Sequence, residues 1–247
     1  MGTRRLGRPV TESPAGGGSV PVDGEARPDA PWIDPADRRV GILGGTFDPI
    51  HYGHLLIAEQ VREALGLDRV LFIPAAMPPH KLGLEITAPA DRAAMVELAI
   101  AGNASFAICR IELDRSGPSY TVDTLETLAN EARRQGIIRK LFFILSSEAA
   151  AALPSWRAPA RILELAQLAV VPRPGFPVPD GQVLGAMAGG SEDRVLTIET
   201  LPLAHSASDI RRRAEAGRSI RYLVPPAVEA YIRDHRLYRS EDPRRTA

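Results

Sequence analysis

The sequence has a single cysteine, Cys109, and therefore cannot form an internal disulfide. This residue lies in the strand-like run 106–111, where we expect a buried and unreactive thiol. A chain without disulfides suits a reducing compartment. The sequence therefore predicts a cytoplasmic protein.

Long apolar runs are missing as well. No stretch approaches the ~20 consecutive apolar residues that a membrane-spanning helix needs. The basic residues Arg4, Arg5 and Arg8 are followed by proline, glycine and serine rather than by the apolar core of a signal peptide. These absences argue against a membrane protein and against secretion.

Net charge is also absent, because 30 Lys and Arg residues balance 30 Asp and Glu residues. This balance removes any argument from whole-protein charge for a nucleic-acid partner or an anionic membrane surface, and we predict neither. Binding must be argued from local sites. A homo-oligomer stays open, since nothing in the sequence decides the oligomeric state.

What is present suits one compact enzyme domain. A chain of 247 residues, 45% of them hydrophobic, can bury the core of a single α/β domain. Residues 1–38 are rich in Pro, Gly, Ala and charge and have no apolar period, which predicts a disordered N-terminal extension. We expect the domain to span 39–240 and a C-terminal tail to occupy 241–247.

Within this domain, short apolar runs alternate with segments of helical spacing. Apolar runs with few polar positions are typical of strands covered on both faces of a parallel sheet. The pattern predicts an α/β fold with a doubly wound, Rossmann-like parallel sheet, whose ligands bind beyond the carboxyl ends of the strands. The predicted strands are 39–44, 69–74, 106–111, 140–145, 168–171 and 195–198; the predicted helices are 55–65, 91–101, 119–134, one near Ser206 and one after Pro225; 173–193 is predicted as a surface loop.

The first predicted strand runs into the sequence GGTFDPIHYGH, from Gly44 to His54, which we call the signature segment. Its glycines allow a sharp turn close to a ligand, and a helix N-terminus attracts phosphate. His51 and His54 share one helical face, and Gly53 is expected to leave a gap between them for a triphosphate. A tight turn with two surface histidines is the simpler alternative, but the whole constellation favours a phosphate cradle.

The signature segment resembles that of the nucleotidylyltransferase superfamily, whose His-x-Gly-His element binds ATP phosphates. The resemblance implies in-line attack by a substrate phosphate oxygen on the α-phosphorus of ATP, with pyrophosphate leaving together with Mg²⁺ and no covalent enzyme intermediate. We assign no residue as a metal ligand. It implies that His54 stabilises charge on the α-phosphate and that His51 holds the phosphates beside it. ATP contacts are implied for Gly44, Gly45, Thr46, Phe47 and Gly53. No Gly-Lys-Ser/Thr follows the glycines, so the segment is not a P-loop.

Further segments between Val40 and Tyr238 resemble the family of bacterial nicotinate-nucleotide adenylyltransferases. The first is Pro78-Pro79-His80-Lys81. Its prolines fix an extended loop, and Lys81 brings a point charge suited to the phosphate of the acceptor, with His80 assigned to the same site. A solvated lysine on a rigid loop is the alternative.

Two other segments concern the acceptor ring. The hydroxyls of Ser119 to Leu125 are expected to cap a helix, and the resemblance implies that the main chain near Thr121 faces the nicotinate carboxylate. Trp156, with Arg157 beside it, is assigned to the acceptor site because an indole can stack on a pyridinium ring. A core tryptophan is the alternative reading.

The segment from Ser206 to Arg211 is predicted to open another helix near ATP. Ser206 and Asp209 have nearly the spacing of a capping box, so a structural cap explains both. Arg211 lies one turn into the helix, and the resemblance implies a contact with the triphosphate. We therefore group Arg211 with His51 and His54 as catalytic, and assign Ser206 and Ser208 to ATP binding.

The sequence departs from the family where Ser146-Ser147-Glu148 replaces the usual Gly-x-Asp and Ala207 replaces a serine. The predicted function is adenylyl transfer from ATP to nicotinate mononucleotide, giving deamido-NAD and pyrophosphate in NAD biosynthesis, with Mg²⁺ accompanying ATP. Two alternatives stay open. One is another acceptor, either nicotinamide mononucleotide or pantetheine phosphate, and the other is a weakly active regulatory paralogue that binds nucleotide.

Overall fold

The computed structural model describes residues 33–78, 85–186, 194–201, 206–239 and 245–246, all within one compact unit of the chain. Its centre is a sheet of six parallel strands in the order β4-β2-β1-β5-β6-β7. The strands are β1 (Arg39–Gly45), β2 (Arg69–Pro74), β4 (Phe106–Ile108), β5 (Lys140–Ser146), β6 (Gln167–Val171) and β7 (Val195–Thr197). The strand order reverses between β1 and β5, which is where doubly wound sheets bind ligands.

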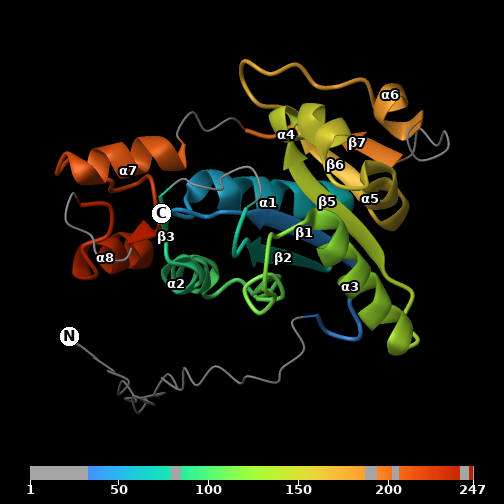
Figure 1. The fold of residues 1–247 in the computed structure, drawn as a ribbon, viewed down its shortest axis with the longest axis horizontal. Helices are drawn as coiled ribbons and strands as arrows, with labels where there is room; N and C mark the ends of the chain where they lie inside the picture. The colour runs from blue at the N-terminus through green and yellow to red at the C-terminus, as the bar shows by residue number, and fades with distance from the viewer. Residues whose placement is uncertain (1–32, 79–84, 187–193, 202–205, 240–244, 247) are drawn as a thin grey trace, which may run out of the picture. The chain divides into compact units, whose positions relative to one another are not determined.

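Helices cover both faces of this sheet (Figure 1). One face packs against α1 (Tyr52–Leu65), α2 (Pro89–Ile100), α7 (Ala207–Glu215) and α8 (Pro226–Asp234), and the other against α3 (Thr121–Arg134), α4 (Ser147–Ala152), α5 (Pro159–Leu165) and α6 (Gly181–Ala186). Successive residues of a strand therefore enter different cores: Phe142 and Ile144 of β5 face the first, Leu141 and Phe143 the second. The predicted doubly wound fold is confirmed.

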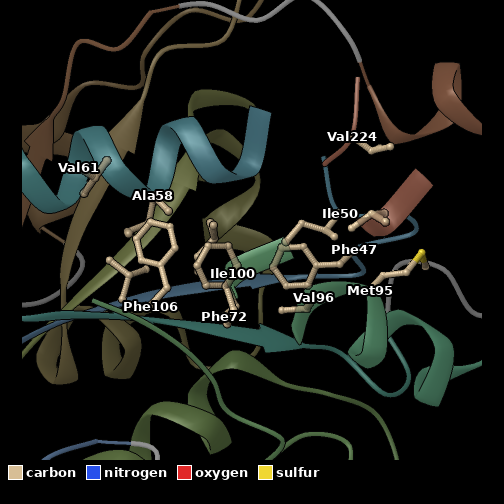
Figure 2. Packing of buried hydrophobic residues seen from close by; sticks show 14 of the residues in the cluster. Phe47, Ile50, Ala58, Val61, Phe72, Met95, Val96, Ile100, Phe106 and Val224 are labelled. Carbon is tan, nitrogen blue, oxygen red and sulfur yellow. The ribbon is translucent and has the colours of Figure 1, made fainter. Parts of the chain in front are cut away.

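A row of aromatic rings fills the core beneath α1. Figure 2 shows Phe47, Phe72 and Phe106 in succession, with Ala58 and Val61 of α1 above them. The Phe47 and Phe72 rings lie 5.9 Å apart and the Phe72 and Phe106 rings 5.1 Å apart. Aromatic pairs at such separations stabilise a core beyond their buried area. The signature segment thus reaches into the main core through Phe47.

Local boundaries differ from the expectations in three places. Helix α1 begins at Tyr52, earlier than predicted, because the histidines of the signature segment form its first turn. Strand β4 ends at Ile108, before its predicted end, and a turn over 110–114 follows. The predicted loop 173–193 contains the short helix α6, which buries Leu184 despite the many prolines and glycines around it.

Cys109 is buried, and burial raises the pKa of its thiol to about 12, as expected of an inert residue.

Two further features lie outside the predicted pattern. A small antiparallel pair joins β3 (Ile86–Thr87) to β8 (Arg245–Thr246), within the segment predicted as the tail. At the other end, Ile33 is buried in the core and Asp37 forms an ion pair with Arg69 at 2.6 Å. The described chain is therefore packed from Ile33 onward, while residues 1–32 lie outside the described ranges.

No helix in the described ranges is both long enough and apolar enough to cross a membrane.

Candidate active site

The turn between β1 and α1 presents two histidines at a helix N-terminus. His51 is the N-cap of α1, and its Nδ1 accepts a hydrogen bond from the main-chain N–H of Gly53 at 3.1 Å. The Nδ1 of His54 accepts from the main-chain N–H of His51 at 3.3 Å. The two imidazoles stack with their centroids 3.8 Å apart. Histidines therefore take the reciprocal capping role that Ser or Thr and Glu usually share.

This capping arrangement fixes the chemistry of both rings. An Nδ1 that accepts a hydrogen bond holds no proton, so the neutral imidazole carries its proton on Nε2. Each ring then offers an Nε2–H donor beside the first turn of α1, where helix N–H groups carry about half a positive charge. Donors and partial positive charge at one point suit a phosphate oxyanion.

Gly53 has a role different from the predicted gap for a triphosphate. A Cβ at this position would lie 2.9 Å from both Cε1 and Nδ1 of His51, so the imidazole occupies the space that the missing side chain leaves. The stacked rings of His51 and His54 close the interval between them. Glycine is required here because the His51 ring packs directly against the main chain.

The residues before the histidines shape the turn. Gly44 is exposed at the end of β1. A Cβ at Gly45 would lie 3.1 Å from the Phe47 ring, which is only 2% exposed and packs edge-on against His54 at 5.1 Å. Phe47 is therefore a core residue that anchors the turn, and its contact with ATP stays a prediction. Its φ of +50° is an uncommon conformation that the tight turn imposes.

Sequence reasoning missed Arg92, a fully buried arginine of α2. Its guanidinium donates to the main-chain carbonyls of Thr87 at 2.8 Å, Thr46 at 2.7 Å and Ala76 at 3.3 Å. Burial lowers the pKa of Arg92, and the nearby Asp48 carboxylate partly opposes that shift. The sequence does contain a signal for this residue. Arg92 lies three and four residues before Met95 and Val96, on the buried face of the helix, where an apolar residue is expected.

Arg211 reaches the same turn from α7. Its Nη1 donates to the main-chain carbonyl of Asp48 at 2.6 Å, and its Nη2 donates to the Ser208 hydroxyl at 3.2 Å. The side chain stays 25% exposed, so part of the guanidinium faces solvent. The structure therefore brings Arg211 to the signature segment that carries both histidines, with Ser208 beside it.

Ser206 performs the structural role that its spacing predicted. It is the N-cap of α7, and its hydroxyl accepts from the main-chain N–H of Asp209 at 3.2 Å and donates to the Asp209 carboxylate at 2.8 Å. These bonds, with Arg212 nearby, lower the pKa of Asp209. The predicted cap is confirmed.

The predicted hydroxyl cap of α3 is wrong. Tyr120 is the N-cap, and its side chain makes no capping hydrogen bond. The Ser119 hydroxyl instead accepts from the main-chain N–H groups of Ala76 at 3.1 Å and Met77 at 3.3 Å, because Ser119 lies beside the segment that follows β2. Thr121 is the half-buried first residue of the helix. The first turn of α3 thus keeps main-chain donors for another partner.

The start of α3 is tied to the signature segment through the loop after β2. The Ala76 carbonyl accepts from Arg92, which also holds Thr46, while the Ala76 N–H donates to Ser119. These hydrogen bonds link the segments after β1 and β2 to the residues just before α3. The predicted ATP side and the predicted acceptor side are therefore mechanically joined.

Trp156 and Arg157 follow the short 3-10 helix η2 (Leu153–Ser155) beyond the end of β5. The half-buried Trp156 packs its ring edge against Phe143, with the ring centroids 6.1 Å apart. One part of the indole therefore belongs to the core, as the alternative interpretation expected, and the other part is exposed. Arg157 lies over the Tyr120 ring at 4.7 Å and forms an ion pair with Asp123 at 3.7 Å. The structure thus places Arg157 against the first turn of α3, next to Thr121.

The departure at 146–148 is integrated into its surroundings. The Ser146 hydroxyl caps α4 by accepting from the Ala149 N–H at 3.2 Å. The buried Ser147 hydroxyl donates to the Phe176 carbonyl and accepts from the Arg173 N–H, both at 3.0 Å. Glu148 pairs with Arg173 across the surface. Each substituted side chain therefore has a structural partner.

Two predicted site residues, His80 and Lys81, lie outside the described residues. Within the described part of the chain, no three His, Cys, Asp or Glu side chains gather into a group that could hold a metal ion. The donor groups at the signature segment suit anions rather than cations.

Comparison with known proteins agrees with this geometry. The model of the cytidylyltransferase-like family matches residues 42–213, which include both histidines and Arg211. A probable nicotinate-nucleotide adenylyltransferase of Thermomicrobium roseum is 49% identical over 202 residues, covering 82% of this chain and 92% of the relative. One from Roseiflexus sp. is 50% identical over 200 residues, covering 81% of this chain and 98% of the relative.

Solved structures support the fold at greater sequence distance. The Plasmodium falciparum nicotinic acid mononucleotide adenylyltransferase complexed with NaAD has a TM-score of 0.66 at 18% identity, covering 81% of this chain and 97% of that one. The same enzyme complexed with APC has a TM-score of 0.64, also at 18% identity and the same coverage.

Proposed function

The chain belongs to the nicotinate-nucleotide adenylyltransferases within the cytidylyltransferase-like family, and on that basis we propose how its site works. The reaction is transfer of the adenylyl group of ATP to nicotinate mononucleotide. A phosphate oxygen of the mononucleotide forms a bond to the α-phosphorus, and the bond from that phosphorus to the bridging oxygen of the β-phosphate breaks. Deamido-NAD and pyrophosphate result, a step of NAD biosynthesis.

The observation that carries the mechanism is the pair of Nδ1 atoms that accept main-chain hydrogen bonds. Because both rings are held this way, their Nε2–H groups are preorganised as donors, and they need no rearrangement when charge develops on the α-phosphate. In phosphoryl-type transfer the protein mainly positions the reactants and stabilises charge. We assign charge stabilisation at the α-phosphate to His54, and phosphate binding to His51 and Arg211.

The acceptor is assigned to the start of α3. A carboxylate there accepts from the main-chain N–H groups of the first turn and gains from the helix dipole. Trp156 stacks on the pyridinium ring, and Arg157 lies nearby over Tyr120. His80 and Lys81 remain proposed contacts of the acceptor phosphate.

Mg²⁺ is proposed as a companion of the triphosphate. Mg²⁺ usually keeps several waters and is bound largely through substrate phosphates. Its contribution would be to neutralise the leaving pyrophosphate. The assignment to the cytoplasm stays a prediction.

The experiment measures pyrophosphate release from ATP with nicotinate mononucleotide, nicotinamide mononucleotide or pantetheine phosphate as the acceptor. We expect nicotinate mononucleotide to be preferred over the amide by at least about tenfold in kcat/KM. The carboxamide presents an NH₂ donor to main-chain donors and leaves a buried group unpaired, at a cost of ~1–3 kcal/mol. Equal use of both would refute the acceptor assignment, and no release with any acceptor would favour a regulatory nucleotide-binding protein.

Trp156→Ala provides the matched control for this specificity. Either pyridinium ring can stack on the indole, so this variant should weaken binding of both mononucleotides to a similar degree. The preference for the carboxylate should survive, because it is assigned to the first turn of α3.

A further inference from the structure

The signature segment contains a buried carboxylate that the proposed chemistry does not use. Asp48 is 4% exposed, the Nη1 of Arg211 lies 3.9 Å from its Oδ2, and the buried Arg92 interacts with its charge as well. The Thr87 N–H reaches the same Oδ2 only at 3.4 Å. Burying a carboxylate is costly unless donors satisfy it, so the other oxygen requires a partner.

That partner is Tyr238, which comes from the far end of the chain. Its hydroxyl donates to Asp48 Oδ1 at 2.9 Å, and its side chain is 1% exposed. Burial and the Asp48 charge raise the pKa of Tyr238 well above its ordinary value, so the phenol stays protonated and remains a donor.

The main chain around Tyr238 adopts uncommon conformations to make this contact. Arg236 and Tyr238 have φ values of +54° and +63°, and such left-handed positions are unfavourable for residues other than glycine. The turn after α8 accepts them while the Tyr238 ring is buried beside Met95. The conformations bring a hydroxyl to the carboxylate of the signature segment.

We infer that Tyr238 is a positioning residue of the ATP site, which acts on Arg211 through Asp48. With the hydroxyl in place, Oδ1 is satisfied, and Arg211 binds the Asp48 carbonyl at 2.6 Å while its Nη1 stays 3.9 Å from the carboxylate. Without the hydroxyl, the unsatisfied carboxylate draws the guanidinium into a closer ion pair and away from the triphosphate. This inference rests on the proposed role of Arg211 in ATP binding.

The first test is Tyr238→Phe, which removes the hydroxyl and keeps the ring. KM for ATP should rise about fivefold or more, as expected when a buried charged acceptor loses its donor. KM for nicotinate mononucleotide should stay within about twofold, because Tyr238 is buried in the core on one face of the sheet and α3 packs on the other. A variant that binds ATP as wild type does would overturn the inference.

Tyr231→Phe is the matched control. Tyr231 lies in α8 and donates to the Asp91 carboxylate at 2.8 Å, so it too joins a phenol to an aspartate of another element. It has no place in the ATP or acceptor site. We expect some loss of thermal stability and no change in KM for ATP; an equal rise in both variants would mean that Tyr238 acts only through general stability.

A double-mutant cycle separates positioning from stability. ATP affinity, measured by calorimetry without an acceptor, should fall in Tyr238→Phe and in Arg211→Ala, and the double variant should bind no more weakly than Arg211→Ala. Losses that add would overturn the inference. Since the cycle needs no acceptor, it stands apart from the acceptor assay, whose failure would instead refute the proposed function.

Asp48→Asn provides a second route if Tyr238→Phe does not fold. The amide oxygen still accepts from Tyr238, but the negative charge facing Arg211 is gone. In the inferred mechanism, the Asp48 charge competes with the triphosphate for the Arg211 guanidinium. Once that charge is removed in Asp48→Asn, a further Tyr238→Phe substitution should leave ATP affinity unchanged. A further loss of more than about twofold would overturn the inference.

Discussion

Replacing Gly53 by alanine should separate activity from stability in this protein. The added Cβ would lie 2.9 Å from two atoms of the His51 ring. Ordinary carbon contacts begin near ~3.5 Å, so the ring must move by roughly 0.5 Å or more. His54 stacks against His51 at 3.8 Å, and the displacement therefore passes to the second imidazole.

The expected effect on turnover is large. A misplacement of about 1 Å can cost roughly a hundredfold in rate, so a shift of half that size should lower kcat by about tenfold or more. Stability should change little. Alanine is better than glycine in a helix by up to about 1 kcal/mol, and this offsets the ~1 kcal/mol lost with a weakened Gly53 to His51 hydrogen bond.

Steady-state pyrophosphate release and thermal unfolding, measured on the same preparation, provide the assay. Gly181→Ala is the control, because a Cβ there would meet Val195 at an ordinary 3.6 Å. We expect the control to retain full activity. A Gly53→Ala enzyme with kcat within about twofold of wild type would refute the account of how the His51 ring is held.

Three further outcomes are expected. His54→Ala should lower kcat by roughly a hundredfold with a smaller effect on ATP affinity, since its donor acts mainly in the transition state; near-normal turnover would remove it from the mechanism. Ile33→Ala should lower the free energy of unfolding by about 2 kcal/mol or more in denaturant titrations, because the side chain is 5% exposed, and no change would place Ile33 outside the core. The double variant Ser146→Gly and Glu148→Asp should keep its turnover and lose under about 1.5 kcal/mol, because glycine is a tolerable N-cap and the Glu148 pair is exposed; a clear loss of turnover would mean that the site depends on these departures.

The strands and the signature segment could be predicted because their patterns are local. Strands such as 140–145, which is apolar at every position after Lys140, carry this pattern because both of their faces are covered, and the signal does not depend on the rest of the chain. The Ser206 cap was equally visible, since its partner is three residues away. Local spacing was enough for these elements.

Contacts between distant residues could not be predicted in the same way. Asp48 and Tyr238 are 190 residues apart, and no pattern in either neighbourhood pairs them. Serine is a common helix cap, yet the Ser119 hydroxyl accepts from the main-chain N–H groups of Ala76 and Met77. It does so because the tertiary structure places the segment after β2 beside it. Sequence patterns identify polar residues with a role, whereas packing decides which partner each one takes.

Arg92 has a consequence for any attempt to redesign the acceptor specificity. Loops at the end of a parallel sheet are usually treated as interchangeable parts that can be replaced one at a time. Here one side chain holds three carbonyls from two of them: Thr46 in the connection after β1, and Ala76 and Thr87 in the connection between β2 and α2. A graft that changes the main-chain path at one of these positions would release a buried guanidinium donor and disturb the other two. Re-engineering would have to exchange both loops together, or confine its changes to the first turn of α3 and the segment around Trp156.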